Sequence, residues 1–187
     1  MKKTLPLLLL GIVTFITNVY SQDVKKELEA SKTKMDVFIS KTGMITKFVD
    51  TKLPNLKTSF GGAETRIRKI SSGATVGFFY QIVKESKYEN STASIEYNDL
   101  LEVLKAIKVL KPEVEKDIAN KPDYLENKFI TVDGFQVGYY ISNAKASWYI
   151  KLEKYGSDNT LFIDNGELIE TAFNNAKNKI EELKKNP

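Results

Sequence analysis

The 187-residue sequence contains neither cysteine nor histidine, and these two absences exclude several kinds of chemistry. Without them there is no Ser–His or Cys–His nucleophile pair, no imidazole general base and no Cys/His zinc site. There is also no disulfide, so apolar burial and hydrogen bonding have to stabilise the fold. The sequence has no P-loop and no G-x-G-x-x-G motif either. We therefore expect no enzymatic activity, no metal site and no cofactor.

Long apolar runs are scarce, and the one that exists lies at the N-terminus. Lys2 and Lys3 precede the run LPLLLLGIVTFI at residues 5–16, and Val19-Tyr20-Ser21 then fits a signal-peptidase site. The pattern predicts a cleaved signal peptide over residues 1–21, without the cysteine of a lipoprotein anchor. The run is shorter than the roughly 20 apolar residues of a spanning helix, so no membrane span is expected.

Excess charge is also small once this leader is removed. Removing the leader takes away Lys2 and Lys3 but none of the 24 acidic residues, so the net charge falls from +4 to +2. This near-neutral balance argues against nucleic acid as a partner. A short leader with flanking lysines, on a chain without cysteine, is typical of the bacterial cell envelope. We expect a soluble protein that is periplasmic or secreted.

The rest of the chain divides into two halves with the same order of patterns. Residues 22–34 are a charged lead-in that can form a short helix. Residues 35–111 contain six β-type runs separated by turn signals, followed by an amphipathic helix with 3.6-residue apolar spacing. Residues 112–126, which contain two prolines, are predicted to connect this half to residues 127–187. That second half again shows strands, with a hairpin turn at Asp133-Gly134, and then a helix.

The boundaries of these predicted elements follow from turn and capping residues. The six strands of the first half are predicted at residues 36–40, 44–49, 56–60, 64–70, 74–83 and 93–97. Asn98 is the predicted N-cap of the first long helix, and Pro112 is expected to end or kink it. Asp164 and Glu167 have capping-box spacing before the second helix.

The two halves also look related in sequence, which predicts an internal repeat. GFFYQIVK at residues 77–84 matches SWYIKLEK at 147–154, and SIEYNDLLE at 94–102 matches FIDNGELIE at 162–170. We predict an α+β fold in which two tandem strands-then-helix units form one curved antiparallel sheet, share a core and place both long helices on the same face. This arrangement is similar in outline to the TATA-binding-protein-like architecture, although no motif assigns a family. The alternative is a β-barrel or β-sandwich module with a C-terminal helix.

Strand alternation separates the predicted core face from a candidate binding face. Phe78, Tyr80 and Ile82 share one face of their strand and are predicted to be core, as are Trp148, Ile150 and Leu152. The opposite, helix-free face holds the candidate binding residues Arg66, Arg68, Phe79, Gln81, Gln136, Tyr140, Tyr149 and Lys151. Aromatic and amide side chains with a few cations are typical of recognition surfaces. The alternative is an ordinary solvent-facing sheet, or one covered by residues 35–60.

The functional prediction is an exported, non-enzymatic binding or interaction protein whose partner is a small molecule, a glycan or a protein. The alternative is a carboxylate-dependent hydrolase acting on envelope glycans, with Glu85, Glu89 and Glu96 as the candidate acids. Asp158, Asp164 and Glu167 could attract Ca²⁺ but lack the alternating spacing of a calcium loop, so we expect no metal there.

Overall fold

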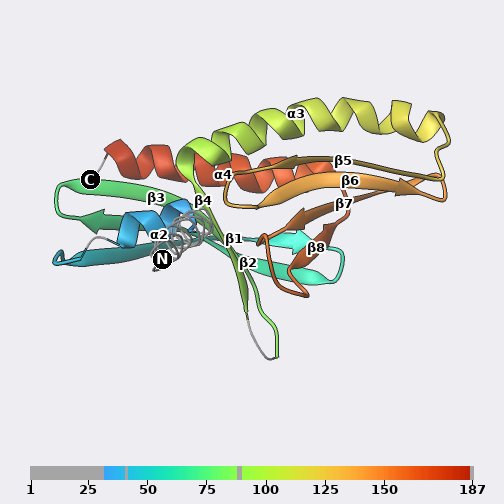
Figure 1. Ribbon diagram of the computed structural model, residues 1–187. Helices are drawn as coiled ribbons and strands as arrows, with labels where there is room; N and C mark the ends of the chain where they lie inside the picture. The colour runs from blue at the N-terminus through green and yellow to red at the C-terminus, as the bar shows by residue number, and fades with distance from the viewer. Residues whose placement is uncertain (1–31, 41, 88–89, 186–187) are drawn as a thin grey trace, which may run out of the picture. The chain divides into compact units, whose positions relative to one another are not determined.

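Figure 1 shows a computed structural model of the protein, which describes residues 32–40, 42–87 and 90–185. The predicted signal peptide and most of the lead-in at residues 22–34 lie outside these ranges. The helices and strands described below all belong to one unit, Lys34–Pro187.

Eight strands form two four-stranded antiparallel sheets, and in each sheet consecutive strands are neighbours. The first sheet consists of β1 (Thr46–Thr58), β2 (Gly61–Ser72), β3 (Thr75–Lys84) and β4 (Ser91–Glu96). The second consists of β5 (Tyr124–Ile130), β6 (Gln136–Ser142), β7 (Lys145–Lys151) and β8 (Thr160–Ile163). The α+β fold with antiparallel sheets is confirmed, and the described strands do not close into a barrel.

The sheets meet at one corner, where we had predicted a single continuous sheet. The backbone N–H of Ser59, just after β1, donates to the carbonyl oxygen of Phe162 in β8 at 2.9 Å. Because β8 is only four residues long and meets the end of β1, the two edge strands lie together over a short distance only. The result is two sheets with a shared corner.

Strand β1 replaces two of the predicted strands. No turn separates the predicted strands at residues 44–49 and 56–60: the chain continues as one 13-residue strand whose register against β2 shifts between Leu53 and Leu56. Proline has no backbone N–H to donate, and an edge strand tolerates it at such an irregularity. Pro54 therefore marks a bulge within one strand, where the sequence pattern predicted the gap between two strands.

The predicted strand at residues 36–40 is also wrong, because Lys34–Ile39 form the short helix α2. The ring of Phe38 lies 6.1 Å from the ring of Phe79 in β3, with an interplanar angle of 78°. Its apolar side chain thus packs onto the first sheet, and the segment does not pair as a strand.

The two long helices are α3 (Tyr97–Ala119) and α4 (Gly166–Lys185). α3 continues through Pro112, which is exposed, as is Lys108, the residue whose carbonyl loses its helical hydrogen bond to the proline. The predicted connection at residues 112–126 therefore consists of the end of α3, a short turn and the start of β5. The caps differ from those predicted: Glu96 Oε2 accepts from the Asn98 N–H at 2.8 Å, and Asn165 Oδ1 from the Leu168 N–H at 3.0 Å.

Each long helix packs partly over the other half of the chain. α4, which follows the second sheet, contacts β1 and β2 of the first sheet as well as β8. α3, which follows the first sheet, contacts β5, β6 and β7, and it also contacts α4 (Figure 1). The buried side chains of both halves form one hydrophobic core. Both triads predicted to be core are buried in it: Phe78, Tyr80 and Ile82, and Trp148, Ile150 and Leu152.

Candidate functional site

On the first sheet, the predicted binding face is covered by α2. Phe79 is 1% exposed and Gln81 is 2% exposed. The prediction that they lie on an open binding surface is therefore wrong. Gln81 Nε2 donates to Ser94 Oγ at 2.9 Å and lies 3.8 Å from the sulfur of Met35 in α2. The contacting residues Met35 and Phe38 fall within residues 35–60, the segment that was the alternative prediction for a cover.

The two arginines predicted for this face are held by neighbouring side chains. Arg66 Nε donates to Gln81 Oε1 at 2.8 Å. Arg68 forms a two-point ion pair with Asp50, with distances of 2.8 and 2.7 Å, and its guanidinium lies 5.7 Å from the centroid of the Phe48 ring. The hydrogen bond from Arg68 lowers the pKa of the Asp50 carboxyl. Both arginine side chains therefore form contacts that connect neighbouring strands of the first sheet.

Two carboxylates hold the N-terminal end of α2. Lys34 Nζ forms an ion pair with Asp99 Oδ1 in α3, and the Lys34 backbone N–H donates to Asp133 Oδ2 at 3.0 Å. Burial raises the pKa of the Asp133 carboxyl, although the hydrogen bond from Lys34 acts in the opposite direction. The α2 cover thus depends on contacts with α3 and with the β5–β6 turn.

On the second sheet, the equivalent face carries a cluster of four aromatic rings, which we call the aromatic face: Tyr124, Tyr140, Tyr149 and Phe162. The strand register places all four on the same side, away from the core residues of β6 and β7. Tyr140 lies at the centre of the cluster. Its ring centroid is 6.2 Å from that of Tyr124, 6.5 Å from that of Tyr149 and 6.4 Å from that of Phe162. The predicted residues Gln136 and Lys151 pair with each other on this side and are half-buried.

Tyr149 forms the buried base of the aromatic face. Its side chain is only 6% exposed, and its hydroxyl donates to Glu126 Oε1 at 2.6 Å. Burial, together with this hydrogen bond, raises the pKa of the Tyr149 phenol, whereas the same bond lowers the pKa of Glu126. Lys128 completes the group through a 3.0 Å ion pair with Glu126. Tyr149 was predicted to contact a ligand, but its hydroxyl is bonded within the sheet.

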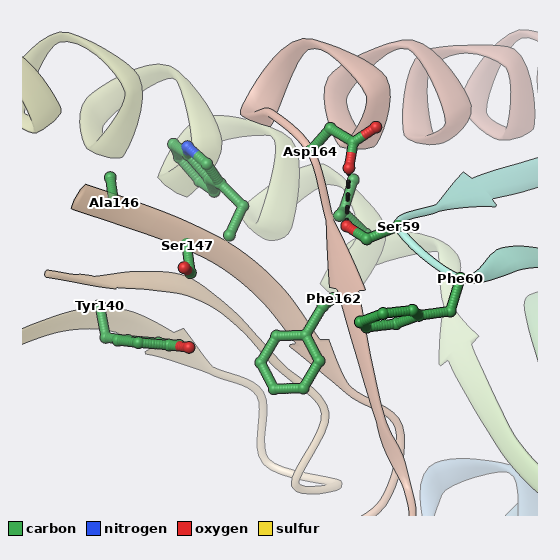
Figure 2. Close-up of a pocket in the computed structure, with 9 residues that line it drawn as sticks. Ser59, Phe60, Tyr140, Ala146, Ser147, Phe162 and Asp164 are labelled. Carbon is green, nitrogen blue, oxygen red and sulfur yellow. Dashed lines mark hydrogen bonds between the residues drawn. The ribbon is translucent and has the colours of Figure 1, made fainter. Parts of the chain in front are cut away.

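At the edge of the aromatic face the surface is hollowed by a cavity of about 450 Å³ (Figure 2). We call this cavity the corner hollow, and its lining residues are Ser59, Phe60, Tyr140, Ala146, Ser147, Trp148, Phe162, Ile163 and Asp164. It forms where β8 ends. Ile163 is the last residue of β8 and pairs with Trp148, so β7 extends further than its neighbour at Ser147 and Ala146. The β1–β2 turn supplies the opposite wall through Ser59 and Phe60.

The polar and aromatic groups of the corner hollow come from segments that are distant in the sequence. Ser59 Oγ donates to Asp164 Oδ1 at 2.7 Å, which orients the carboxylate (Figure 2). The Phe60 side chain is 89% exposed and the Phe162 side chain is 38% exposed. The rings of Tyr140 and Phe162 stand nearly perpendicular, with an interplanar angle of 80°.

Among the residues lining the hollow, sequence reasoning had identified only Tyr140 as a binding candidate. Phe60 was placed in a strand and Asp164 was interpreted as a helix cap. The signal at Phe60 was its position directly before Gly61-Gly62, where a turn leaves a large apolar side chain in solvent. No local signal could place Asp164 beside Ser59, because that contact depends on the meeting of the two sheets.

The candidate acids do not come together in a common site among the described residues. Glu96 caps α3, Glu85 is exposed, and Glu89 lies outside the described residues. Asp158 binds Lys84 and Glu167 binds Lys111, so these acids do not meet Asp164 in a common site. Within the described ranges, no group of three or more acidic side chains is placed to hold a metal ion. Nor do these ranges include a helix long and apolar enough to cross a membrane.

Comparison with known proteins gives no relative: no family model, no curated protein and no solved structure matches this chain.

Proposed function

We propose that the protein is an exported, non-enzymatic binding protein of the bacterial cell envelope, and that it binds its ligand on the aromatic face and in the corner hollow. The observation that carries this proposal is the cluster around Tyr140, in which four rings on the helix-free side of the second sheet lead into a cavity of about 450 Å³. The expected signal peptide supports export. The absence of histidine and cysteine supports a non-enzymatic role.

The proposed surface has the composition of binding sites in general. Aromatic side chains supply large contact area and are enriched at recognition surfaces, where few other residues are needed to fix orientation. Ligand cavities commonly have volumes of about 300–1,000 Å³ and combine apolar walls with a few polar groups. The corner hollow fits this description, since four of its nine lining residues are aromatic and its polar groups include hydroxyls and one carboxylate.

The contrast between the two sheets supports the choice of surface. The face of the first sheet that points away from the shared core is covered by α2, and its polar residue Gln81 is hydrogen-bonded from both sides. On the second sheet, Tyr124 remains 62% exposed and Phe162 38% exposed within the part of the chain that the structure describes. Exposed aromatic clusters of this kind commonly mark binding surfaces.

No observation favours the hydrolase alternative over binding. Glycoside hydrolysis needs two carboxyl groups facing each other across the scissile bond. Of the candidate acids, Glu96 is engaged as a helix cap, and the corner hollow contains a single carboxylate, that of Asp164.

The test is a ligand screen with variants on and off the surface. The exported form, beginning at Gln22, is screened by thermal shift against small molecules, glycans and peptides, and hits are measured by calorimetry. A hit on this surface should lose about fivefold or more in affinity in Tyr140→Ala and in Phe162→Ala, because each removes a stacking ring worth roughly 1 kcal/mol or more. Tyr155→Ala is the matched control, since Tyr155 is 68% exposed on the β7–β8 loop. Ligands that bind both folded surface variants with unchanged affinity would contradict the proposal.

A further inference from the structure

The chemistry of the corner hollow indicates which class of ligand it takes. Resting on the proposed function, we propose that the hollow binds an organic cation with an alkylated ammonium group, such as a quaternary ammonium. The residues that carry this proposal are the three aromatic side chains Tyr140, Phe162 and Phe60, together with the carboxylate of Asp164.

The aromatic rings that line the hollow carry partial negative charge on their faces. Tyr140 and Phe162 have centroids 6.4 Å apart and planes at 80°, so together they form a corner of two perpendicular rings. Phe60 adds a third ring at the β1–β2 turn, next to Phe162 in Figure 2. A cation within about 6 Å of a ring centroid is attracted by the ring quadrupole, and several rings at an angle to one another recognise alkylated ammonium groups.

The charge of the hollow has the matching sign. Asp164 is the only charged side chain among its nine lining residues, which include no lysine and no arginine. Ser59 Oγ holds Oδ1 of Asp164, which orients the carboxylate and leaves Oδ2 outside that bond. A phosphate or carboxylate ligand would therefore meet a like charge and no cation from the described residues, whereas an organic cation would meet an opposite charge.

The chain's own cations occupy other rings. Arg68 lies over Phe48, Lys154 over Tyr155, and Lys184 over Phe78 and Tyr97. Within the described ranges, no lysine or arginine is found over the rings of Tyr140, Phe162 or Phe60. Among the described residues, the chain's own cations therefore leave these three rings open to a cationic ligand.

The walls favour an alkylated ammonium over a small hydrated ion. Apart from the rings, Ala146 and Ile163 line the hollow, so much of its surface is apolar. Methyl groups on the nitrogen make contact with such walls, while the charge interacts with the ring faces and the carboxylate. A bare metal ion would need several oxygen ligands, and the hollow supplies one carboxylate and three hydroxyls from serine and tyrosine.

The experiment compares choline with its uncharged carbon analogue 3,3-dimethylbutan-1-ol, which has the same shape. Both are titrated into the exported form of the protein, and binding is followed by the aromatic and backbone NMR signals of Phe60, Phe162 and Tyr140. We expect choline to shift these signals and to bind about tenfold or more tightly than the alcohol, because only choline carries the charge.

Variants test the two parts of the site separately. Phe60→Leu keeps an apolar side chain but removes a ring, and Asp164→Asn keeps the shape but removes the charge; each should weaken choline binding about fivefold or more. Phe48→Leu is the matched control for the ring, because Phe48 is 46% exposed on the first sheet, and it should bind choline as the wild type does. Circular dichroism checks that each variant is folded. If Asp164→Asn does not fold, Phe60→Leu still provides the test, because Phe60 lies at an exposed turn.

The outcomes separate this inference from the proposed function. Equal affinity for choline and the uncharged alcohol would overturn the cation inference while supporting an apolar ligand at the proposed surface. Absence of choline binding, together with shifts of the same signals by a neutral sugar, would overturn it in favour of a glycan. If no compound of the wider screen perturbs these signals, both the inference and the proposed surface are wrong.

Discussion

The ring of Tyr80 in β3 packs edge-on against the ring of Phe173 in α4, with centroids 5.1 Å apart and an interplanar angle of 81°. Both side chains are fully buried, and they come from opposite halves of the chain. Phe173 also lies 5.8 Å from Phe135, which precedes β6. One side chain of the last helix therefore joins the first sheet to the second.

This position predicts a large loss of stability when the Phe173 ring is removed. Phe173→Ala should lower the free energy of unfolding by about 3–5 kcal/mol, the usual cost of deleting a buried phenylalanine. Urea denaturation followed by circular dichroism measures it. Val109→Ala, at a position 67% exposed on α3, should change stability by less than about 0.5 kcal/mol. Similar effects for the two substitutions would show that α4 does not pack on the first sheet as described.

The exchange of helices predicts that neither half folds alone. A fragment of residues 22–122 keeps the first sheet but loses α4, which exposes the buried faces of Tyr80 and Ile67. It should show poor NMR dispersion and no cooperative melting, and mixing it with residues 123–187 should restore both. A cooperatively folded N-terminal fragment would contradict the shared core.

The contact between α2 and Asp133 predicts a pH dependence of stability. Burial raises the pKa of Asp133 in the folded protein, so its contribution to stability is fully present below the ordinary aspartate pKa and is lost as pH rises through the raised value. Asp133→Asn should remove this dependence while still accepting the Lys34 N–H. We expect the variant to be at least as stable as the wild type at neutral pH, with a flatter stability–pH curve in the acidic range. A marked loss of stability at neutral pH would show that the carboxylate charge is needed to hold α2.

The hydrogen bond from Tyr149 to Glu126 predicts a late phenol titration. Because burial and Glu126 raise the pKa of Tyr149, its phenol should ionise at a higher pH than ordinary tyrosines, and ultraviolet titration measures this. Tyr149→Phe should remove one of the late-ionising phenols, which also include Tyr80, Tyr97 and Tyr139, and should cost about 0.5–1.5 kcal/mol in stability, the usual value of one hydrogen bond. Tyr155→Phe, on the exposed loop, should leave the stability unchanged. A titration in which Tyr149→Phe removes an ordinary step would contradict the buried bond.

Much of the fold could be predicted because it depends on local patterns. The alternation in GFFYQI correctly places Phe78, Tyr80 and Ile82 in the core, and the 3.6-residue spacing correctly predicts both long helices. Local rules were insufficient where the position of an unfavourable residue in the fold makes it tolerable. Pro112 does not end α3 because it faces water, and Pro54 does not end β1 because an edge strand accommodates it.

The candidate site shows the same division. By its own alternation the sequence determined which side chains leave the core, including Phe79, Gln81, Tyr140 and Tyr149. Whether such a face is covered depends on segments distant in the chain, so only the tertiary structure decided that α2 covers Phe79 and Gln81 while Phe162 remains partly exposed. The corner hollow likewise exists because β8 ends early beside the β1–β2 turn, which brings Ser59 and Asp164 within hydrogen-bonding distance. Periodicity encodes the direction of each side chain, whereas packing between distant segments decides what that side chain meets.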